Sequence, residues 1–381
     1  MALDAGSASF DDAMSAAPRF LVSGYYGFGN TGDDAILAGL IEGFRELRPA
    51  AELTVLSGNP AETIAEHGVI GVPRGLASAR RQLGLSDALI SGGGGLLQDV
   101  TSWRSPLYYL AVMRLARSAR RPIAFIGQSI GPLRRRWVGS LVRRAVSPVE
   151  AMAVRDVASR QALIELGLSR LPEVTADLAF LLSPPTDGEI ASARGKVGLS
   201  DVTDPVAAIA LRRRPGVEQD QSMAEVGAAI GSACDRLGLR PLLIPMQPAQ
   251  DTQVARAVGA SLPAGRAIIA PPLRAREVLA LTASCQMVIA MRLHALIFAA
   301  LSRVPLVAIS YDPKVDGLME QLGLKPAAEL ARFDAARLKQ AIEESWHRRA
   351  DVSEAVGARL PRLRSLALRN VELALSLVPT A

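Results

Sequence analysis

Short runs of apolar residues alternate along this chain with longer segments whose apolar positions recur every three or four residues. The short runs lack polar alternation, which is typical of strands covered on both faces of a sheet. Segment 33–47 has helical spacing, with Ile36, Leu40 and Phe44 on one face. In the first half we therefore expect strands separated by helices, with the strands at residues 20–24, 53–56, 88–90, 123–126 and 152–154.

The rhythm breaks over residues 182–204, which are rich in Ser, Pro, Gly and Asp, and then restarts. Segment 332–377 carries repeated Leu and Arg at helical spacing, and 381 residues suffice for two cores. The sequence thus predicts an α/β fold of two Rossmann-like domains with an interdomain cleft. We expect a disordered tail at 1–18, one domain at 19–185, and a second at 205–381 that includes the terminal helices. The strands of the second domain are expected at residues 206–211, 241–245, 267–270, 287–290 and 306–309.

The charge balance favours an anionic partner. Lys and Arg number 43 against 37 Asp and Glu, for a formal net charge of +6, which suits a phosphate-bearing substrate, a nucleic acid or an acidic membrane surface. The chain has no run of about 18 apolar residues that would predict a membrane-spanning helix. Its start lacks the basic and apolar pattern of a secretion signal, so we expect a cytoplasmic protein.

The first glycine-rich turn comes after the first expected strand, at residues 24–34. It contains Gly-x-Gly-x-x-Gly, but an acidic residue that would bind a ribose does not end the second strand, so a dinucleotide site is not favoured. Asn30, Thr31 and Asp33 stand where a helix begins, so these residues either bind a polar ligand or cap the helix.

Four consecutive glycines come after the strand at 88–90 and lead to Gln98. Such a run is costly in chain entropy, and it suits a place where a ligand or another backbone comes close. Since ligands of parallel α/β sheets bind beyond the carboxyl ends of the strands, Gly94 and Gln98 are candidates for that site.

Arg134, Arg135, Arg136 and Trp137 come after the fourth expected strand and its GQSIGPL turn. Arg134 is the nearest to the strand end and is our candidate for the cleft; the alternative is a solvated face of arginines. The stretch up to Arg144 is basic and amphipathic, which also suits contact with an anionic membrane.

In the second half, Arg292 and His294 close one apolar run, and Lys314 comes after the next. Lysine and histidine are rare here, with four and three copies, so their occurrence at strand ends is informative. The three side chains can converge on one anion, with Arg134 opposite, and the histidine can move a proton near neutral pH. We expect the two cysteines, Cys234 and Cys285, to be buried thiols, and we expect neither a metal nor a cofactor.

Seven segments, in order, resemble the polysaccharide pyruvyl transferases, and most closely those of the bacterial CsaB type. The resemblance runs from about residue 21 to residue 323 and implies a GT-B-like fold. It also implies transfer of pyruvate from phosphoenolpyruvate to a sugar as a cyclic ketal. The segments are GYYGFGNTGDDAIL, SGGGGLLQD, GQSIGPL, VRD with the helix SRQALIELG, ADLAFLL, MRLHALIFA and ISYDPKV.

The resemblance implies that His294 and Lys314 are donor-binding and catalytic residues. It implies the same for an arginine, which we assign to Arg134 with Arg135 as the alternative, and Arg292 is a further candidate for the donor. Asp34 stands where relatives often carry Glu, which leaves the acceptor contact open, and the base is either Asp33 or Asp177.

The implied acceptor is a β-linked N-acetylmannosamine on a lipid-linked precursor of a secondary cell wall polymer, which would place the enzyme at the inner face of the membrane. The ketal would supply the negative charge that surface-layer homology domains recognise. Acceptor contacts would come from Asn30, Thr31, Asp33, Gly94 and Gln98.

Two alternatives remain at this point. One is a GT-B glycosyltransferase that uses a nucleotide sugar, which would share the fold and the cleft. The other is a non-catalytic protein that binds a nucleic acid or a membrane through its positive charge. Nucleic acid is not expected, since aromatic residues make up only 4% of the chain and the arginines are spread over many segments.

Overall fold

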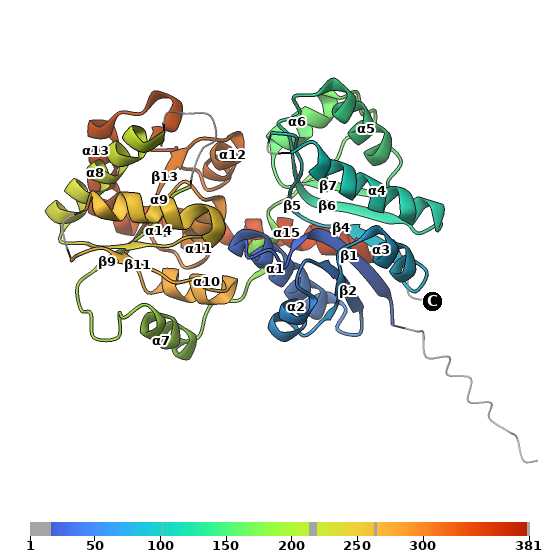
Figure 1. Cartoon of the computed structure of the whole chain (residues 1–381), viewed down its shortest axis with the longest axis horizontal. Helices are drawn as coiled ribbons and strands as arrows, with labels where there is room; N and C mark the ends of the chain where they lie inside the picture. The colour runs from blue at the N-terminus through green and yellow to red at the C-terminus, as the bar shows by residue number, and fades with distance from the viewer. Residues whose placement is uncertain (1–16, 101, 213–218, 263–264, 379–381) are drawn as a thin grey trace, which may run out of the picture.

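The computed structural model describes residues 17–100, 102–212, 219–262 and 265–378. Most of the tail expected at 1–18 lies outside these residues. Two α/β lobes lie side by side, the first blue to green and the second yellow to orange (Figure 1).

Parallel strands form the sheet of the first lobe, in the order β3-β2-β1-β4-β6-β7-β8, and β5 pairs with β6. The strands are β1 (Arg19–Tyr26), β2 (Glu52–Ser57), β3 (Ile70–Pro73), β4 (Ala88–Ser91), β5 (Gly94–Leu97), β6 (Ile123–Ile130), β7 (Ala151–Val154) and β8 (Glu173–Val174). The helices between them are α1 (Thr31–Leu47), α2 (Pro60–His67), α3 (Leu76–Leu83), α4 (Arg104–Ser118), α5 (Arg136–Val146), α6 (Val157–Glu165) and the 3₁₀ turn η1 (Leu178–Leu181).

The sheet of the second lobe is also parallel, in the order β11-β10-β9-β12-β13-β14, which is the strand order of a Rossmann fold. The strands are β9 (Val206–Ala210), β10 (Arg240–Leu243), β11 (Ile268–Ile269), β12 (Met287–Ala290), β13 (Leu306–Ser310) and β14 (Ala328–Glu329). The helices are α8 (Gln219–Leu237), α9 (Pro248–Ala260), α10 (Ala275–Ala283), α11 (Leu293–Leu301), α12 (Pro313–Gln321), η2 (Leu330–Arg332), α13 (Ala335–His347), α14 (Arg349–Gly357) and α15 (Leu360–Leu375).

The prediction of two parallel α/β sheets is confirmed, and all ten expected strands are present. Four others, β3, β5, β8 and β14, were not expected, because they have only two to four residues and lie mostly at or near sheet edges. The expected connection at 182–204 contains the helix α7 (Asp187–Lys196). A capping box starts this unexpected helix, in which Thr186 and Glu189 each bind the other's backbone.

The last helix, α15, returns to the first lobe and packs against η1, β6, β7 and α1 (red in Figure 1). We expected the terminal helices in the second domain, and α15 departs from that expectation. The buried Asn370 gives the physical reason. Its amide donates to the carbonyl oxygen of Ala176 at 3.1 Å and accepts from the hydroxyl of Thr175 at 3.0 Å, so the helix completes buried hydrogen bonds of the first lobe.

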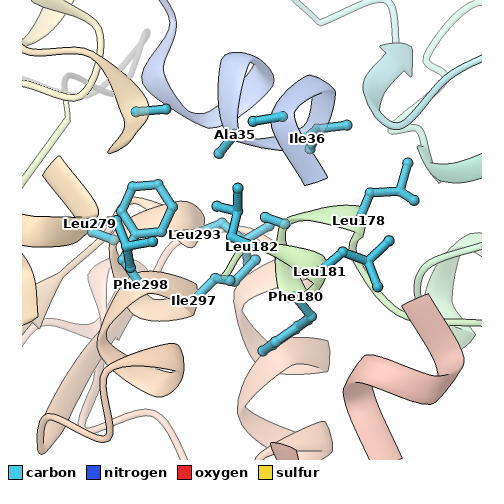
Figure 2. Packing of buried hydrophobic residues seen from close by; sticks show 14 of the residues in the cluster. Ala35, Ile36, Leu178, Phe180, Leu181, Leu182, Leu279, Leu293, Ile297 and Phe298 are labelled. Carbon is cyan, nitrogen blue, oxygen red and sulfur yellow. The ribbon is translucent and has the colours of Figure 1, made fainter. Parts of the chain in front are cut away.

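One apolar cluster continues from lobe to lobe. Ala35 and Ile36 of α1 and Leu178 of η1 belong to the same buried cluster as Ile297 and Phe298 of α11. Figure 2 shows these side chains packed between the elements of the two lobes. The lobes are therefore joined by a hydrophobic core, which restricts their relative motion.

Candidate active site

Three helices begin where the two lobes meet, each directly after a strand or its turn. α1 comes after β1, with the side chain of Asn30 accepting from the N–H of Gly32 at 3.1 Å. α11 and α12 come after β12 and β13 and place His294 and Lys314 in their first turns. Strand ends and helix starts thus bring the candidates from both lobes to one junction, as the sequence predicts for parallel sheets.

A chain of three side chains crosses this junction, of which Asp177 and Arg155 are buried and His294 is partly buried. His294 Nε2 lies 3.6 Å from Asp177 Oδ2, and the same oxygen accepts from Arg155 Nη1 at 2.7 Å. The other oxygen of Asp177 accepts from the N–H of Ala179 at 3.0 Å. Burial alone would raise the pKa of Asp177, but His294 and Arg155 outweigh it and hold the pKa well below its usual range. An ionised carboxylate therefore faces the imidazole.

The opposite side of the imidazole lies against α1. A Cβ atom on Gly32 would stand 2.2 Å from His294 Nδ1, so only glycine leaves room for the ring at this position. The neighbouring Thr31 is buried, and its N–H donates across the junction to the carbonyl oxygen of Met246 at 3.0 Å. Thr31 therefore joins the lobes, whereas we expected it to contact an acceptor; the acceptor contact itself stays a prediction.

Asp33 lies beside this chain on the side of the glycine turns. It accepts a short hydrogen bond from the side chain of Asn30. Gly94 faces it: its φ of +101° suits glycine, and a Cβ there would stand 2.8 Å from Asp33 Oδ1. Burial raises the pKa of Asp33 to about 6, although His294, Arg155 and Lys314 oppose the shift. This carboxyl group can therefore exchange a proton close to neutral pH.

A cleft of about 310 Å³ opens next to these residues, between the lobes. One wall is the segment 129–133 at the end of β6 with the first turns of α6, and the other is the start of α12 with Lys314. Lys314 Nζ lies 3.3 Å from Asp312 Oδ2, and Lys314 also borders a smaller space with Arg155 and Asp177. Lys314 thus connects the cleft to the His294–Asp177–Arg155 chain.

The three arginines considered for donor binding have other partners. Arg134 directly follows the wall segment and its side chain is exposed; its backbone N–H donates to Asp99 at 2.6 Å. Arg135 contacts the same carboxylate at 3.6 Å. Arg292 forms a short ion pair with the buried Asp251, so its Nη2 has a partner within the second lobe. The structure thus brings neither Arg134 nor Arg292 into the buried chain, and their donor contacts stay predictions.

Arg155 is a site residue that was not expected from the sequence. It lies in the VRD segment and directly follows β7, just as the other candidates follow their strands. This position alone could have marked it as a candidate site residue. Its burial and its pairing with Asp177 depend on contacts between segments 22 residues apart. Gln98 directly follows β5, and its side chain accepts from the N–H of Val100 at 2.8 Å.

The remaining predictions concern cysteines, metals and membranes. Cys234 and Cys285 are free and buried, as expected, and burial raises the pKa of both thiols to about 12. Over the described ranges, His, Cys, Asp and Glu side chains do not form a group of three that could hold a metal ion. Among the helices that the structure describes, none has the length and apolar character to cross a membrane.

Solved structures support the GT-B-like fold. The chain resembles the structure of S. aureus MnaA with UDP, with 13% identity and a TM-score of 0.65 over 95% of this chain and 98% of the other. It also resembles a glycosyltransferase from Rickettsia africae, with 10% identity and a TM-score of 0.60 over 96% and 100% of the two chains. These likenesses show the fold alone, which has two Rossmann-like domains.

Sequence comparisons identify the chemistry. The amylovoran biosynthesis protein AmsJ of Erwinia amylovora is 23% identical, and the match covers 81% of this chain and 87% of that protein. The sequence profile of polysaccharide pyruvyl transferases matches residues 30–313, which include the four-glycine run, Arg155, Asp177 and His294. This chain therefore belongs to the polysaccharide pyruvyl transferase family, and it is a transferase of polysaccharide biosynthesis.

Proposed function

We propose that the protein transfers pyruvate from phosphoenolpyruvate to two hydroxyls of one sugar, forming a cyclic ketal and releasing phosphate. The observation that carries this proposal is the meeting of His294, Lys314 and Arg155 with Asp33 beside the interdomain cleft. Cations, a proton donor and a carboxyl group that titrates near neutral pH are the groups that such a reaction requires.

The donor would occupy the cleft. Phosphoenolpyruvate carries a phosphate and a carboxylate, and Lys314 lines the cleft from the second lobe. The phosphate would replace the carboxylate of Asp312 as the partner of Lys314, whose ammonium group and backbone N–H both contact that carboxylate. Arg134 follows the opposite wall and would close over the donor from the first lobe.

His294 would give a proton to the methylene carbon while a sugar hydroxyl attacks C2. This step forms a C–O bond and converts the methylene to a methyl group. Loss of phosphate and attack by a second hydroxyl then close the ketal. Of the two protons that the hydroxyls release, one is retained in the methyl group and the other leaves with phosphate. Asp177 would hold the imidazole in the orientation for this transfer.

Asp33 is the better candidate for the base that takes the hydroxyl proton. It lies with Asn30 and Gly94 on the side of the expected acceptor, and its pKa is raised to about 6. Asp177 has the opposite character, because it already faces Arg155 and His294 and its pKa is depressed. The two carboxylates that the sequence left as alternatives thus divide into a base and a positioning group.

The finer identity of the acceptor rests on the resemblance of the sequence motifs. We propose a β-linked N-acetylmannosamine on a lipid-linked precursor of a cell wall polymer, whose ketal would serve in surface-layer anchoring. The relative AmsJ is named for amylovoran biosynthesis, which supports a saccharide as the class of acceptor but does not identify the sugar. A saccharide of the amylovoran type is therefore the comparison acceptor in the test.

The test is phosphate release from phosphoenolpyruvate with each acceptor, with mass spectrometry of the product. We expect a mass gain of pyruvate minus water, and at least about a 100-fold lower rate in His294→Ala. Lys314→Ala should raise KM for phosphoenolpyruvate. His347→Ala and Lys325→Ala are matched controls, because both side chains are exposed outside the site. Stabilisation by UDP with no response to phosphoenolpyruvate would support a nucleotide-sugar glycosyltransferase instead.

We further propose that the enzyme works at the inner membrane face through a basic aromatic surface. Trp103 and Trp137 are 40% and 46% exposed and pack edge to face at 5.7 Å. Exposed arginines surround them, and the described residues of 100–104 and 133–147 include no Asp or Glu (the arginines are Arg104, Arg134, Arg135, Arg136, Arg143 and Arg144). Tryptophan favours the membrane interface and arginine favours anionic headgroups.

Vesicles test this surface directly. The protein should sediment with vesicles that contain phosphatidylglycerol and not with neutral phosphatidylcholine vesicles. The double variant Trp103→Ser, Trp137→Ser should lose most of this binding while keeping its activity on a water-soluble acceptor. Equal sedimentation of the variant and the wild type would argue against the proposal.

A further inference from the structure

An arginine outside the catalytic chain is held on aromatic rings at the carboxyl edge of the first sheet. Arg74 directly follows β3, and its N–H donates to the carbonyl oxygen of Ser57 at the end of β2, at 2.8 Å. Its guanidinium carbon lies 3.9 Å from the ring centre of Tyr108 and 5.3 Å from that of Phe28. Both its backbone and its side chain are therefore fixed at this edge.

The aromatic rings come from two separate elements. Phe28 belongs to the glycine turn before α1 and stacks on Tyr25, with ring centres 4.5 Å apart and an interplanar angle of 15°. Tyr108 belongs to α4, one turn beyond Arg104. Phe28 is 39% exposed, and Gly58 leaves the space in which its ring rests, because a Cβ there would stand 2.7 Å from the ring. The cluster thus presents an aromatic face to solvent next to a cation.

Arg74 has no ion pair with a carboxylate over the described part of the chain. Its Nε and the hydroxyl of Tyr109 are buried without a hydrogen-bond partner there. Unpaired buried polar atoms are uncommon in folded proteins, and a cation stacked on aromatic rings keeps its planar edge available for an anion. The Nε–H of Arg74 therefore has a hydrogen-bonding capacity that the described part of the chain does not use.

The cluster also borders the proposed acceptor side. Burial raises the pKa of Tyr25, the negative charge of Asp33 raises it further, and Arg74 opposes both effects. Tyr25 thus lies within electrostatic reach of both the proposed base and the arginine. A saccharide that presents a hydroxyl to Asp33 would extend from there across Phe28 toward Arg74.

We infer that Arg74, Tyr108, Phe28 and Tyr25 form a subsite for an anionic group of the saccharide acceptor, either a phosphate of its linkage or the carboxylate of a uronic acid. This inference rests on the proposed function. The aromatic face takes the apolar side of a sugar ring, and the guanidinium pairs with the anion through two parallel hydrogen bonds. The subsite selects acceptors by their charge and leaves the donor site unchanged.

Calorimetric binding without phosphoenolpyruvate tests the subsite, using three probes with the same terminal N-acetylmannosamine. One probe carries an alkyl diphosphate, one carries a neighbouring glucuronic acid with a methyl aglycone, and one is a neutral methyl glycoside. Wild type should bind at least one anionic probe more tightly than the neutral one, and the probe so favoured identifies the source of the anion. Arg74→Ala should weaken that binding at least tenfold and change the neutral probe less than twofold.

Arg114→Ala is the matched control, because Arg114 is an exposed arginine of the same α4, and it should bind like the wild type. If Arg74→Ala unfolds, Arg74→Lys keeps the charge without the planar fork and should show a smaller loss confined to the anionic probe. Equal loss on all three probes, no loss on either anionic probe, or failure of wild type to prefer an anionic probe would each overturn the inference. Binding as expected without ketal formation would refute the proposed function and leave the subsite standing.

Discussion

Replacing Asp177 with asparagine removes one charge from the buried chain and changes little else. The side chain of Asp177 is 5% exposed, and its partners are His294 Nε2 at 3.6 Å and Arg155 Nη1 at 2.7 Å. Asparagine keeps the shape but only one oxygen, so it can accept either from the N–H of Ala179 or from Arg155, because these two donors contact different oxygens of Asp177. The negative charge between Arg155 and His294 is lost.

This change should affect the unfolding free energy, kcat and KM in different ways. Arg155 is 6% exposed, and removing one partner of a buried pair costs about 3–5 kcal/mol, so we expect a loss of about 3 kcal/mol in unfolding free energy. Because Asp177 positions the proposed proton donor His294, its loss should lower kcat about 100-fold or more. KM for phosphoenolpyruvate should not rise, since the change removes a negative charge near an anionic substrate.

Steady-state kinetics of phosphate release and urea unfolding measure both effects on the same samples. Asp187→Asn, at an exposed position of α7, is the matched control and should match the wild type in both. A kcat within about threefold of the wild type, with the expected loss of stability, would mean that Asp177 is purely structural and does not position the proton donor. A rise in KM at constant kcat would instead place Asp177 in donor binding.

The other predictions concern the glycine turn and the shared core. Gly32→Ala should lower kcat more than tenfold, because the added Cβ would stand 2.2 Å from His294 Nδ1, whereas Gly95→Ala meets no atom within 4 Å and should be neutral in activity assays. Burial raises the pKa of Asp34 to about 8, so the contribution of this side chain to stability falls as pH rises from about 4 to 8. Asp34→Asn should therefore raise Tm relative to the wild type more at pH 8 than at pH 5. An equal shift of Tm at both pH values would contradict this. Phe298→Ala should cost about 3–5 kcal/mol in denaturant unfolding, with both lobes unfolding in one transition, and two separate wild-type transitions would contradict the shared core.

Positions set by strand order could be predicted from the sequence, whereas side-chain partners at long range could not. His294 and Lys314 were correctly placed at strand ends, because the carboxyl ends of parallel strands meet at one edge. Arg155 occupies an equivalent position but was not singled out, since arginine is common in this chain and its burial depends on Asp177. Arg292 stands two residues from His294, yet its guanidinium finds Asp251, a partner that no local pattern reveals.

The glycine run shows the same limit. The four glycines suggested the close approach of a ligand or of another backbone. In the structure Gly92 to Gly94 are packed by the chain itself, against Tyr26, Ile36 and Asp33, and of the four only Gly95 is open. A glycine pattern identifies a close approach without identifying the group that approaches. At this site the approach of the chain to Asp33 serves the chemistry indirectly, because it buries the carboxyl group and so raises its pKa.

The shared core explains how these groups are held ready for reaction. Two-domain folds with a polar interface usually open and close by domain motion, but here α1, η1 and α11 contribute to one apolar cluster behind the site. Separating the lobes would expose that cluster and break the contact of Gly32 with His294. Under the proposed mechanism, the donor would enter through the cleft beside Lys314 and would meet the proposed acid, the proposed base and their partners already in place.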